Sequence, residues 1–365
     1  MSENNSPLTP TGERTEFEDY MMEQFLENKF YFSYSSLQKL MNDPRDFYKK
    51  YILKEWDDED TKVLKQGKLF HCFVLEPENF DDKFIIMSGK MPSPGPKSVV
   101  DMVFERQIKH KITENEDLIG TFFLENFEPQ ILEALIEVDL YQNLTDAKRK
   151  DAQGRMLTGD EKRLEKILTV ECKKYFSLLQ EGEKKTIVDM DMVTVAKQKA
   201  NVMLQNKQVM DWLNPDTSKI DSRTEFEHKT DINGFIFGLK GIIDLIHIDS
   251  VNEKITIVDF KTTSKTIKDW GEGFDESKYL YWLQPIVYKE LILSLVPEKS
   301  KHVWKLEVYY PVIDKNNLVY IFPVKAESLR KWEVQAKEVL EKAKWHMETQ
   351  SFDLSYEYAK GLVSL

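Results

Sequence analysis

The stretch GLKGIIDLIHIDSVNEKITIVDFKTTS, residues 238–264, decides the fold class of this chain. Runs rich in Ile, Val and Phe at 235–248 and 254–262 are typical of β-strands. Asn233-Gly234 comes just before them and is a strong β-hairpin signal. The alternating segment 222–230 is therefore expected to form the first arm of a hairpin, with two further strands after it.

Two acids and a lysine fall on these strands. Asp244 lies on one strand, and Asp259 and Lys261 lie on the next, separated by Phe260. Residues two apart on a strand share a face, so Asp259 and Lys261 point together and Asp244 can reach them from its neighbour. Such carboxylates suit a hard divalent cation, Mg²⁺ with Mn²⁺ as a substitute, and the ammonium suits a phosphodiester. The alternative is a surface cross-strand pair, but the neighbouring side chains are apolar, and buried charges are rarely without a purpose.

The hydrophobic patterns on both sides of this segment predict further helices and strands. Helices are expected near Ser33, Pro44 and Val63 and over 121–142, 159–181, 192–213, 276–295 and 326–349, with strands over 302–312 and 317–324. We expect an α/β fold, with a mixed central β-sheet flanked by helices and a helical N-terminal half. The predicted parts are a flexible tail (1–28), a helical part of the core domain (29–90), a helical insertion (91–214) and an α/β core with a C-terminal helix (215–365).

The amino-acid composition excludes several classes of protein. The 365 residues carry 51 Lys and Arg against 63 Asp and Glu, a net charge of -12, which argues against a simple DNA-coating protein but not against an enzyme with metal-holding carboxylates. Cys72 and Cys172 are the only cysteines, too few for a disulfide framework or a four-thiolate metal site. The N-terminus is polar and acidic, and the apolar runs are short, so we expect a cytoplasmic protein without a membrane span.

This arrangement resembles the PD-(D/E)XK nuclease superfamily in its RecB-like branch, and is most like the phage exonucleases of the RecE (exonuclease VIII) and lambda-exonuclease type. Asp244 followed by Asp259-Phe260-Lys261 is similar to the family signature, although Ile243 stands where a proline is common. Gly67-Lys68-Leu69-Phe70-His71 looks like the family's Gly-x-x-x-His helix, and Gln284 with Tyr288 resembles its Gln-x-x-x-Tyr motif. The resemblance covers 31–80 and 222–325 and leaves 90–213 unexplained.

The resemblance implies a restriction-endonuclease-like sheet and a set of site residues. Catalytic residues would be Asp244, Asp259 and Lys261; metal ligands would be His71, Asp244, Asp259 and Glu225, with Glu227 as the open alternative to Glu225; DNA contacts would be Gln284, Tyr288, Thr262 and Thr263. Each has a plainer interpretation. A lone histidine is usually a core or surface residue, and a tyrosine on a helix usually packs against a sheet.

The function implied is that of a Mg²⁺-dependent exodeoxyribonuclease that acts on double-stranded DNA ends in phage-type recombination or DNA processing. Two alternatives stay open: a non-catalytic DNA-end-binding or recombination-accessory protein on the same fold, and a site-specific endonuclease. The resemblance also implies a ring-shaped homo-oligomer and a single-strand annealing protein as a partner.

Overall fold

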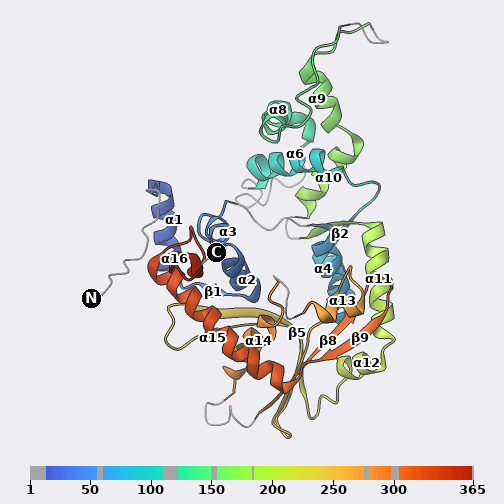
Figure 1. The fold of residues 1–365 in the computed structure, drawn as a ribbon. Coiled ribbons are helices and arrows are strands. Elements are labelled where there is room, and N and C mark those ends of the chain that lie inside the picture. Colours follow the sequence, from blue (N-terminus) through green and yellow to red (C-terminus); the bar gives the residue numbers. More distant parts are fainter. Residues whose placement is uncertain are drawn as a thin grey trace, which may run out of the picture. The chain divides into compact units, whose positions relative to one another are not determined.

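The computed structural model describes residues 14–55, 61–109, 122–148, 154–182, 185–274, 279–296 and 304–363 (Figure 1). Contacts divide the chain into two units. The first unit comprises Met1–Thr61 and Lys199–Leu365, and the second comprises Lys62–Gln198. Within these described ranges, none of the helices has the length and apolar character that crossing a membrane requires.

A mixed β-sheet forms the centre of the first unit. Its strands are β1 (Tyr31–Phe32), β4 (Asp221–Asp231), β5 (Gly238–Asp249), β6 (Lys254–Val258), β7 (Lys261–Thr262), β8 (Lys305–Ile313) and β9 (Val319–Pro323). β5 is antiparallel to both β4 and β6, β6 and β8 are parallel, and β9 is antiparallel to β8. β1 adds to β5 in parallel, at the end away from β6. The predicted mixed α/β architecture is confirmed.

The strand predicted over 254–262 is interrupted at Asp259 and Phe260. β6 and β7 continue one another along β8 with an unchanged register. The backbone N–H of Asp259 still donates to the carbonyl of Tyr309, at 3.0 Å. The N–H of Phe260 instead donates to a carboxylate oxygen of Asp244, at 2.7 Å. A side chain therefore takes the hydrogen bond at the break, which draws the two acids together.

A layer of helices packs against this sheet. The helices of the first unit are α1 (Glu16–Glu27), α2 (Tyr34–Asn42), α3 (Pro44–Phe47), the π-helix η1 (Tyr48–Ile52), α12 (Lys207–Leu213), α13 (Ile267–Glu272), α14 (Leu283–Leu293), α15 (Ala326–Thr349) and α16 (Tyr356–Ala359). α14 packs on β5, and α15 packs on α14 and α2 (Figure 1). Leu37, Leu40, Ile243, Leu291 and Ala343 are fully buried in this core.

Local sequence sets the boundaries of the first helices. Ser33 caps α2, since its hydroxyl accepts from the N–H of Ser36 at 3.2 Å. α2 ends at Asp43, whose backbone is extended because the following Pro44 disfavours a helical conformation there. Asp43 then caps α3, so one residue ends one helix and begins the next. The sequence prediction at this point is confirmed.

The second unit is mainly helical. Its elements are α4 (Lys62–Leu75), η2 (Pro77–Asn79), α5 (Phe80–Lys83), β2 (Phe84–Met87), α6 (Pro94–Phe104), η3 (Glu105–Lys109), η5 (Leu124–Phe127), α8 (Glu128–Glu137), α9 (Gly159–Ile167), α10 (Val170–Glu181), β3 (Thr186–Asp189) and the beginning of α11 (Met190–Leu204), which continues into the first unit. Val99, Ile131, Ile167 and Phe176 are completely buried in its core.

The structure differs from the sequence-based division in two places. Residues 16–27, expected within a flexible tail, form α1, because Thr15 and Glu18 make a capping box and Met22 is buried; residues 1–13 of that tail lie outside the described residues. The second unit begins at Lys62, not at 91, and contains the parallel pair β2–β3. The two strands of this pair are about a hundred residues apart in the chain, so no local sequence pattern indicates that they pair. The sequence pattern around each strand predicts helices instead.

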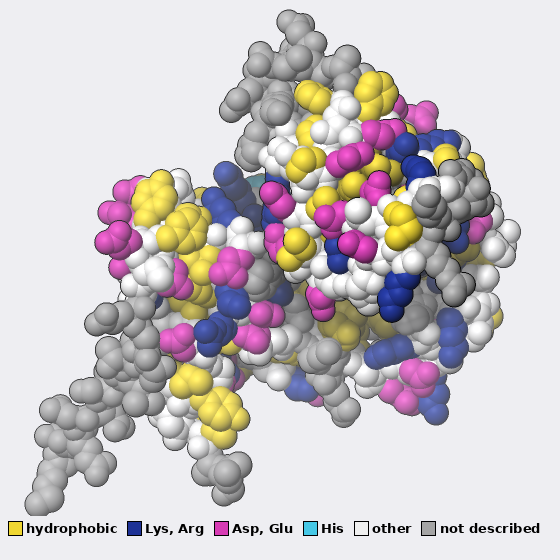
Figure 2. Space-filling model, turned by 90° about the horizontal axis from the view of Figure 1, so that it is seen from above, with side chains coloured by type: hydrophobic (Ala, Val, Ile, Leu, Met, Phe, Trp, Pro, Cys, Tyr) yellow, Lys and Arg dark blue, Asp and Glu magenta, His cyan; other side chains and the backbone are white. Residues whose placement is uncertain are grey.

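Charge is mixed on the surface. Figure 2 shows Lys and Arg side chains interspersed with Asp and Glu over the described part of the face in view. Several exposed charges of the protein are neighbours in ion pairs, such as Lys207 with Asp211 and Lys268 with Glu272. Exposed pairs of this kind contribute little to stability.

Candidate active site

Asp259 lies at the break between β6 and β7 and is almost completely buried, at 1% exposed. Its Oδ1 accepts a hydrogen bond from Nε2 of Gln284, at 3.1 Å, and its Oδ2 forms an ion pair with the ammonium of Lys261. A buried carboxylate is stable only with such partners. The sequence prediction that Asp259 and Lys261 share a face is therefore confirmed by a direct contact.

Asp244 lies on β5, directly across from Asp259. The last pair of the β5–β6 ladder is Leu245 with Val258, so the next position in the same register joins Asp244 to Asp259. Asp244 is 6% exposed, and its Oδ2 accepts from the N–H of Phe260. The two acids thus face each other where the ladder stops.

Glu225 extends this line onto a third strand. The pairs Thr224–Leu245 and Phe226–Ile243 flank it, which places Glu225 level with Asp244. A carboxylate oxygen of Glu225 lies within 4.8 Å of one from Asp244. We call Glu225, Asp244 and Asp259 the acidic row.

The backbone of Glu225 is strained. Its φ is +45°, in the left-handed region, although it lies in the middle of β4. A non-glycine residue there costs about 1–2 kcal/mol, and such strain concentrates at functional sites. Glu227, the alternative that the sequence left open, is exposed and lies level with Ile242. The geometry thus favours Glu225 as the companion of Asp244.

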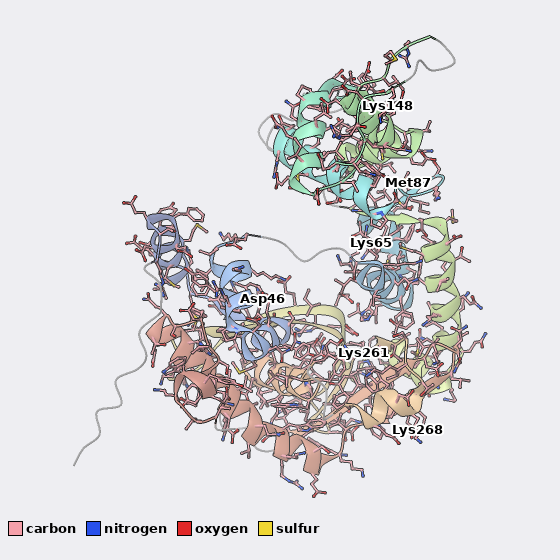
Figure 3. All side chains as sticks on the ribbon, turned by 45° about the horizontal axis from the view of Figure 1, so that its top comes forward. Asp46, Lys65, Met87, Lys148, Lys261 and Lys268 are labelled. Atoms are coloured by element: carbon pink, nitrogen blue, oxygen red, sulfur yellow. The ribbon has the colours of Figure 1, made fainter. Side chains whose placement is uncertain are left out.

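Lys261 lies at the beginning of β7 (Figure 3) and is 22% exposed. Burial by itself would lower the pKa of its ammonium, but the carboxylates of Asp259 and Asp244 raise it, and the net pKa lies above the ordinary value. The two carboxylates thus favour the charged form of Lys261, and an ammonium at this position can stabilise negative charge.

Gln284 and Tyr288 lie one turn apart on α14 and are both buried. Nε2 of Gln284 donates to Asp259 and also to the phenol oxygen of Tyr288, at 2.8 Å. The phenol of Tyr288 donates to the carbonyl of Ile242, at 2.7 Å. Burial, and next the charge of Asp259, raise the pKa of Tyr288 well above its ordinary value. Both side chains hold Asp259 in place, and their predicted contact with DNA stays a prediction.

The other predicted residues lie in two places. Thr262 and Thr263 follow Lys261 and are half-buried; the hydroxyl of Thr263 accepts from the N–H of Lys265, at 3.0 Å. His71 lies on α4 of the second unit, half-buried, with its ring edge-on to Phe70. Its role as a ligand stays a prediction.

Sequence reasoning missed the aromatic side chains that directly precede Gln284 in the chain. Burial raises the pKa of Tyr281, and the charge of Lys261 opposes this in part. Tyr279 lies two residues before Tyr281, and its carbonyl accepts a hydrogen bond from the phenol of Tyr34. The signal available in the sequence was the dense run Tyr279-Leu280-Tyr281-Trp282 just before Gln284.

The acidic row fits a divalent metal ion. The carboxylates of Glu225 and Asp244 lie close together, Asp259 is level with Asp244 and pairs with the Lys261 ammonium, and Asp244 and Asp259 are buried. Oxygen donors of this kind suit Mg²⁺ or Mn²⁺, and a cation would offset the repulsion among the acids.

Among the comparisons with known proteins, the match to a family model is the informative one. A search of curated proteins finds no match. Among solved structures, the chain is similar to a candidate exonuclease from Eubacterium rectale, with 11% identity and a TM-score of 0.41, over 97% of this chain and 95% of that chain. A likeness at this level carries no argument about activity. The family model described as the PD-(D/E)XK nuclease superfamily matches residues 31–353, a range that includes the acidic row, Lys261 and α14. The chain belongs to the PD-(D/E)XK nuclease superfamily.

Proposed function

We propose that the protein is a Mg²⁺-dependent exodeoxyribonuclease that hydrolyses phosphodiesters at double-stranded DNA ends, in phage-type recombination or DNA processing in the cytoplasm. The observation that carries the proposal is the acidic row with the Lys261 ammonium at its end. The exonuclease type, and the likeness to RecE and lambda exonuclease, come from the sequence motifs.

Each residue has a distinct part in this mechanism. Asp244, Asp259 and Glu225 would hold the cation, with His71 as a further ligand on the strength of its motif. A bound Mg²⁺ would supply polarisation of the phosphoryl group and a lower pKa for the attacking water. The ammonium of Lys261 stabilises the negative charge that develops on the phosphoryl oxygens. Gln284 and Tyr288 keep the Asp259 carboxylate aimed at the site.

Thr262 and Thr263 directly follow the catalytic lysine on the same strand edge. Their hydroxyls are donors of the kind that bind phosphate oxygens. We assign them to the DNA backbone next to the cleaved bond. The sequence motif proposes the same contact for Gln284 and Tyr288, which are buried in the protein without DNA.

The proposal is tested with purified protein on linear and circular DNA, with Mg²⁺ and with EDTA. Linear DNA is expected to be degraded from its ends with Mg²⁺ only. Asp259→Asn should abolish cleavage and weaken Mn²⁺ binding in calorimetry, because a ligand is lost. Lys261→Ala should lose turnover but keep Mn²⁺ affinity, since lysine acts on the transition state and is not a ligand.

The matched control is Asp221→Asn on β4, because the Asp221 carboxylate pairs with exposed Arg223 and lies four residues before Glu225 along the strand. It should leave cleavage unchanged. Full activity of Asp259→Asn would refute the site. Cutting of circular DNA would identify an endonuclease, and DNA binding without hydrolysis would identify an accessory protein.

We further propose a ring of subunits that encircles the duplex and works with a single-strand annealing protein. A net charge of -12 repels DNA at long range, so an enzyme that stays on one strand needs topological retention. Closed symmetric assemblies are the common form of homo-oligomer. Light scattering should give a multiple of the 43.0 kDa chain mass. A mass of one chain, with linear DNA bound and at high concentration, would exclude the ring.

A further inference from the structure

Three aromatic rings form a stack beside the acidic row. Phe274 lies against Tyr281, with ring centroids 5.8 Å apart and planes 29° apart, and Tyr281 lies against Tyr279 at 5.5 Å and the same angle. Trp270 supports the inner end, 5.3 Å from Phe274 and 6.1 Å from Tyr281. The outer ring, Tyr279, is 44% exposed. We call Phe274, Tyr281 and Tyr279 the ring stack.

The backbone is bent to make this stack. Leu280, between the two tyrosines, has φ +50°, a left-handed conformation that leucine rarely adopts. The bend is held by the Leu283 N–H, which donates to the Leu280 carbonyl at 2.8 Å, and by the phenol of Tyr34, which donates to the Tyr279 carbonyl. Without the bend, residues two apart in an extended segment would project side by side and not ring on ring. Strain that the surroundings maintain suggests a functional arrangement.

The ring stack is joined to the catalytic residues by one turn of chain. The N–H of Gln284 donates to the carbonyl of Tyr281, at 3.3 Å, and the side chain of Gln284 binds Asp259 at 3.1 Å. Asp259 is in turn the ion-pair partner of Lys261. A phosphodiester at Lys261 would therefore have the ring stack beside its own nucleotide.

Packing in the hydrophobic core does not explain why an aromatic residue occupies position 279. Trp270, the inner support, is 6% exposed, whereas the outer ring presents much of its surface to solvent. An exposed ring at the end of a stack can receive one more flat, apolar layer. Nucleobases are such layers, and they stack on aromatic side chains irrespective of sequence.

We propose that Tyr279 and Tyr281 form a stacking platform for the nucleobase next to the scissile phosphate. This proposal rests on the proposed nuclease function and names the form of DNA that enters the site. A base inside a duplex already has neighbours on both faces, so the base that stacks on Tyr279 is a terminal one with a free face. The DNA at the moment of cleavage is then held by its last nucleotide, at an end of the molecule.

A fluorescence experiment tests the platform without requiring cleavage. The probe is a single-stranded oligonucleotide with 2-aminopurine as its terminal base, in EDTA. Stacking on tyrosine should quench its fluorescence on binding to the wild-type protein. Tyr279→Leu should remove the quenching and weaken binding roughly 5- to 100-fold, the range expected for one stacked base. Tyr279→Phe, which keeps the ring, should retain both.

The matched control is Tyr358→Leu, the same change at a 60% exposed tyrosine on α16. It should leave quenching and affinity unchanged. Absence of quenching by the wild-type protein, or equal quenching by Tyr279→Leu, would overturn the platform. Cleavage of linear DNA by the same wild-type preparation separates this failure from failure of the nuclease assignment.

A kinetic readout follows on linear DNA with an abasic terminal nucleotide. The wild-type enzyme should show a higher KM on this substrate than on intact DNA, with a smaller change in kcat, because the stacked base acts mainly in binding. Tyr279→Leu should make the two substrates equal. A wild-type enzyme that does not distinguish them would also contradict the platform.

Discussion

Glu225 is the residue of the acidic row that has a strained backbone conformation. This strain indicates that the site sacrifices stability for its chemistry. Its left-handed φ keeps the carboxylate near that of Asp244, although two acids so close repel each other. Neither feature helps a metal-free protein to fold. Both are understandable if a cation binds between the carboxylates.

We expect Glu225→Gly to stabilise the metal-free protein and weaken its metal binding. Glycine removes about 1–2 kcal/mol of strain and loses about 0.5–1 kcal/mol through its freer unfolded chain. The free energy of unfolding in urea should rise by up to about 1.5 kcal/mol, while Mn²⁺ affinity falls in calorimetry.

Glu227→Gly, two residues along the same strand, provides the comparison. Glu227 is not among the residues with positive φ, so glycine there should cost about 0.5–1 kcal/mol and leave Mn²⁺ affinity unchanged. The reverse pattern, with metal affinity lost only at Glu227, would reassign the third carboxylate.

At the scale of elements, α14 is the part that aims the acids. It packs on β5 at Gly241, where there is no room for a side chain. A Cβ added there would lie 3.0 Å from Leu291 and 3.2 Å from Tyr288, both on α14. The small residue lets the helix lie close enough for Tyr288 to reach the Ile242 carbonyl.

Gly241→Ala should therefore displace α14 by a few tenths of an ångström. We expect the protein to lose about 1–3 kcal/mol of stability from overpacking. The kcat should fall roughly tenfold, because a misplacement of about 1 Å can cost a hundredfold, while the KM for DNA changes little.

Gly67→Ala serves as the opposite case. Its Cβ would meet nothing within 4 Å in the middle of α4, so alanine should stabilise that helix by about 0.5–1 kcal/mol. If thermal unfolding showed the same change for Gly241→Ala as for Gly67→Ala, close packing of α14 on β5 would not be the reason for glycine at 241.

At the scale of the whole molecule, two buried histidines link stability to pH. His346 on α15 is 1% exposed and its Nδ1 donates to the carbonyl of Ser351, at 2.6 Å; His247 on β5 is 7% exposed. Burial lowers the pKa of both, and for His346 the Ser351 carbonyl and Glu357 oppose this only in part. Each is therefore neutral in the folded protein at a pH where the unfolded chain is protonated.

The sign of the pH effect follows. The unfolded histidines bind protons below about pH 6.5 and the folded ones only at lower pH, so stability is complete above that value and declines below it. Urea unfolding from pH 8 to pH 5 should show this decline, at up to about 1.4 kcal/mol per pH unit for each histidine. His346→Gln should make the free energy of unfolding depend less steeply on pH below pH 6.5. If the dependence is unchanged, His346 does not contribute to it.

The sequence by itself determined the strands, the hairpin and the two acids with their lysine. These depend on local rules: the Ile, Val and Phe content of β5 and β6, the Asn233-Gly234 turn with Gly234 at φ +84°, and the shared face of Asp259 and Lys261. The helix boundary at Asp43-Pro44 followed from the same short-range chemistry. Neighbours in the chain are sufficient to predict each of these features.

Only the tertiary structure decided how distant residues meet. The register of β4 against β5 placed Glu225, and not Glu227, level with Asp244. The packing of α14 turned Gln284 and Tyr288 toward Asp259. The bend at Leu280 stacked Tyr279 on Tyr281. Strand register, helix packing and backbone strain result from contacts across the whole unit, and a local pattern of residues does not contain them.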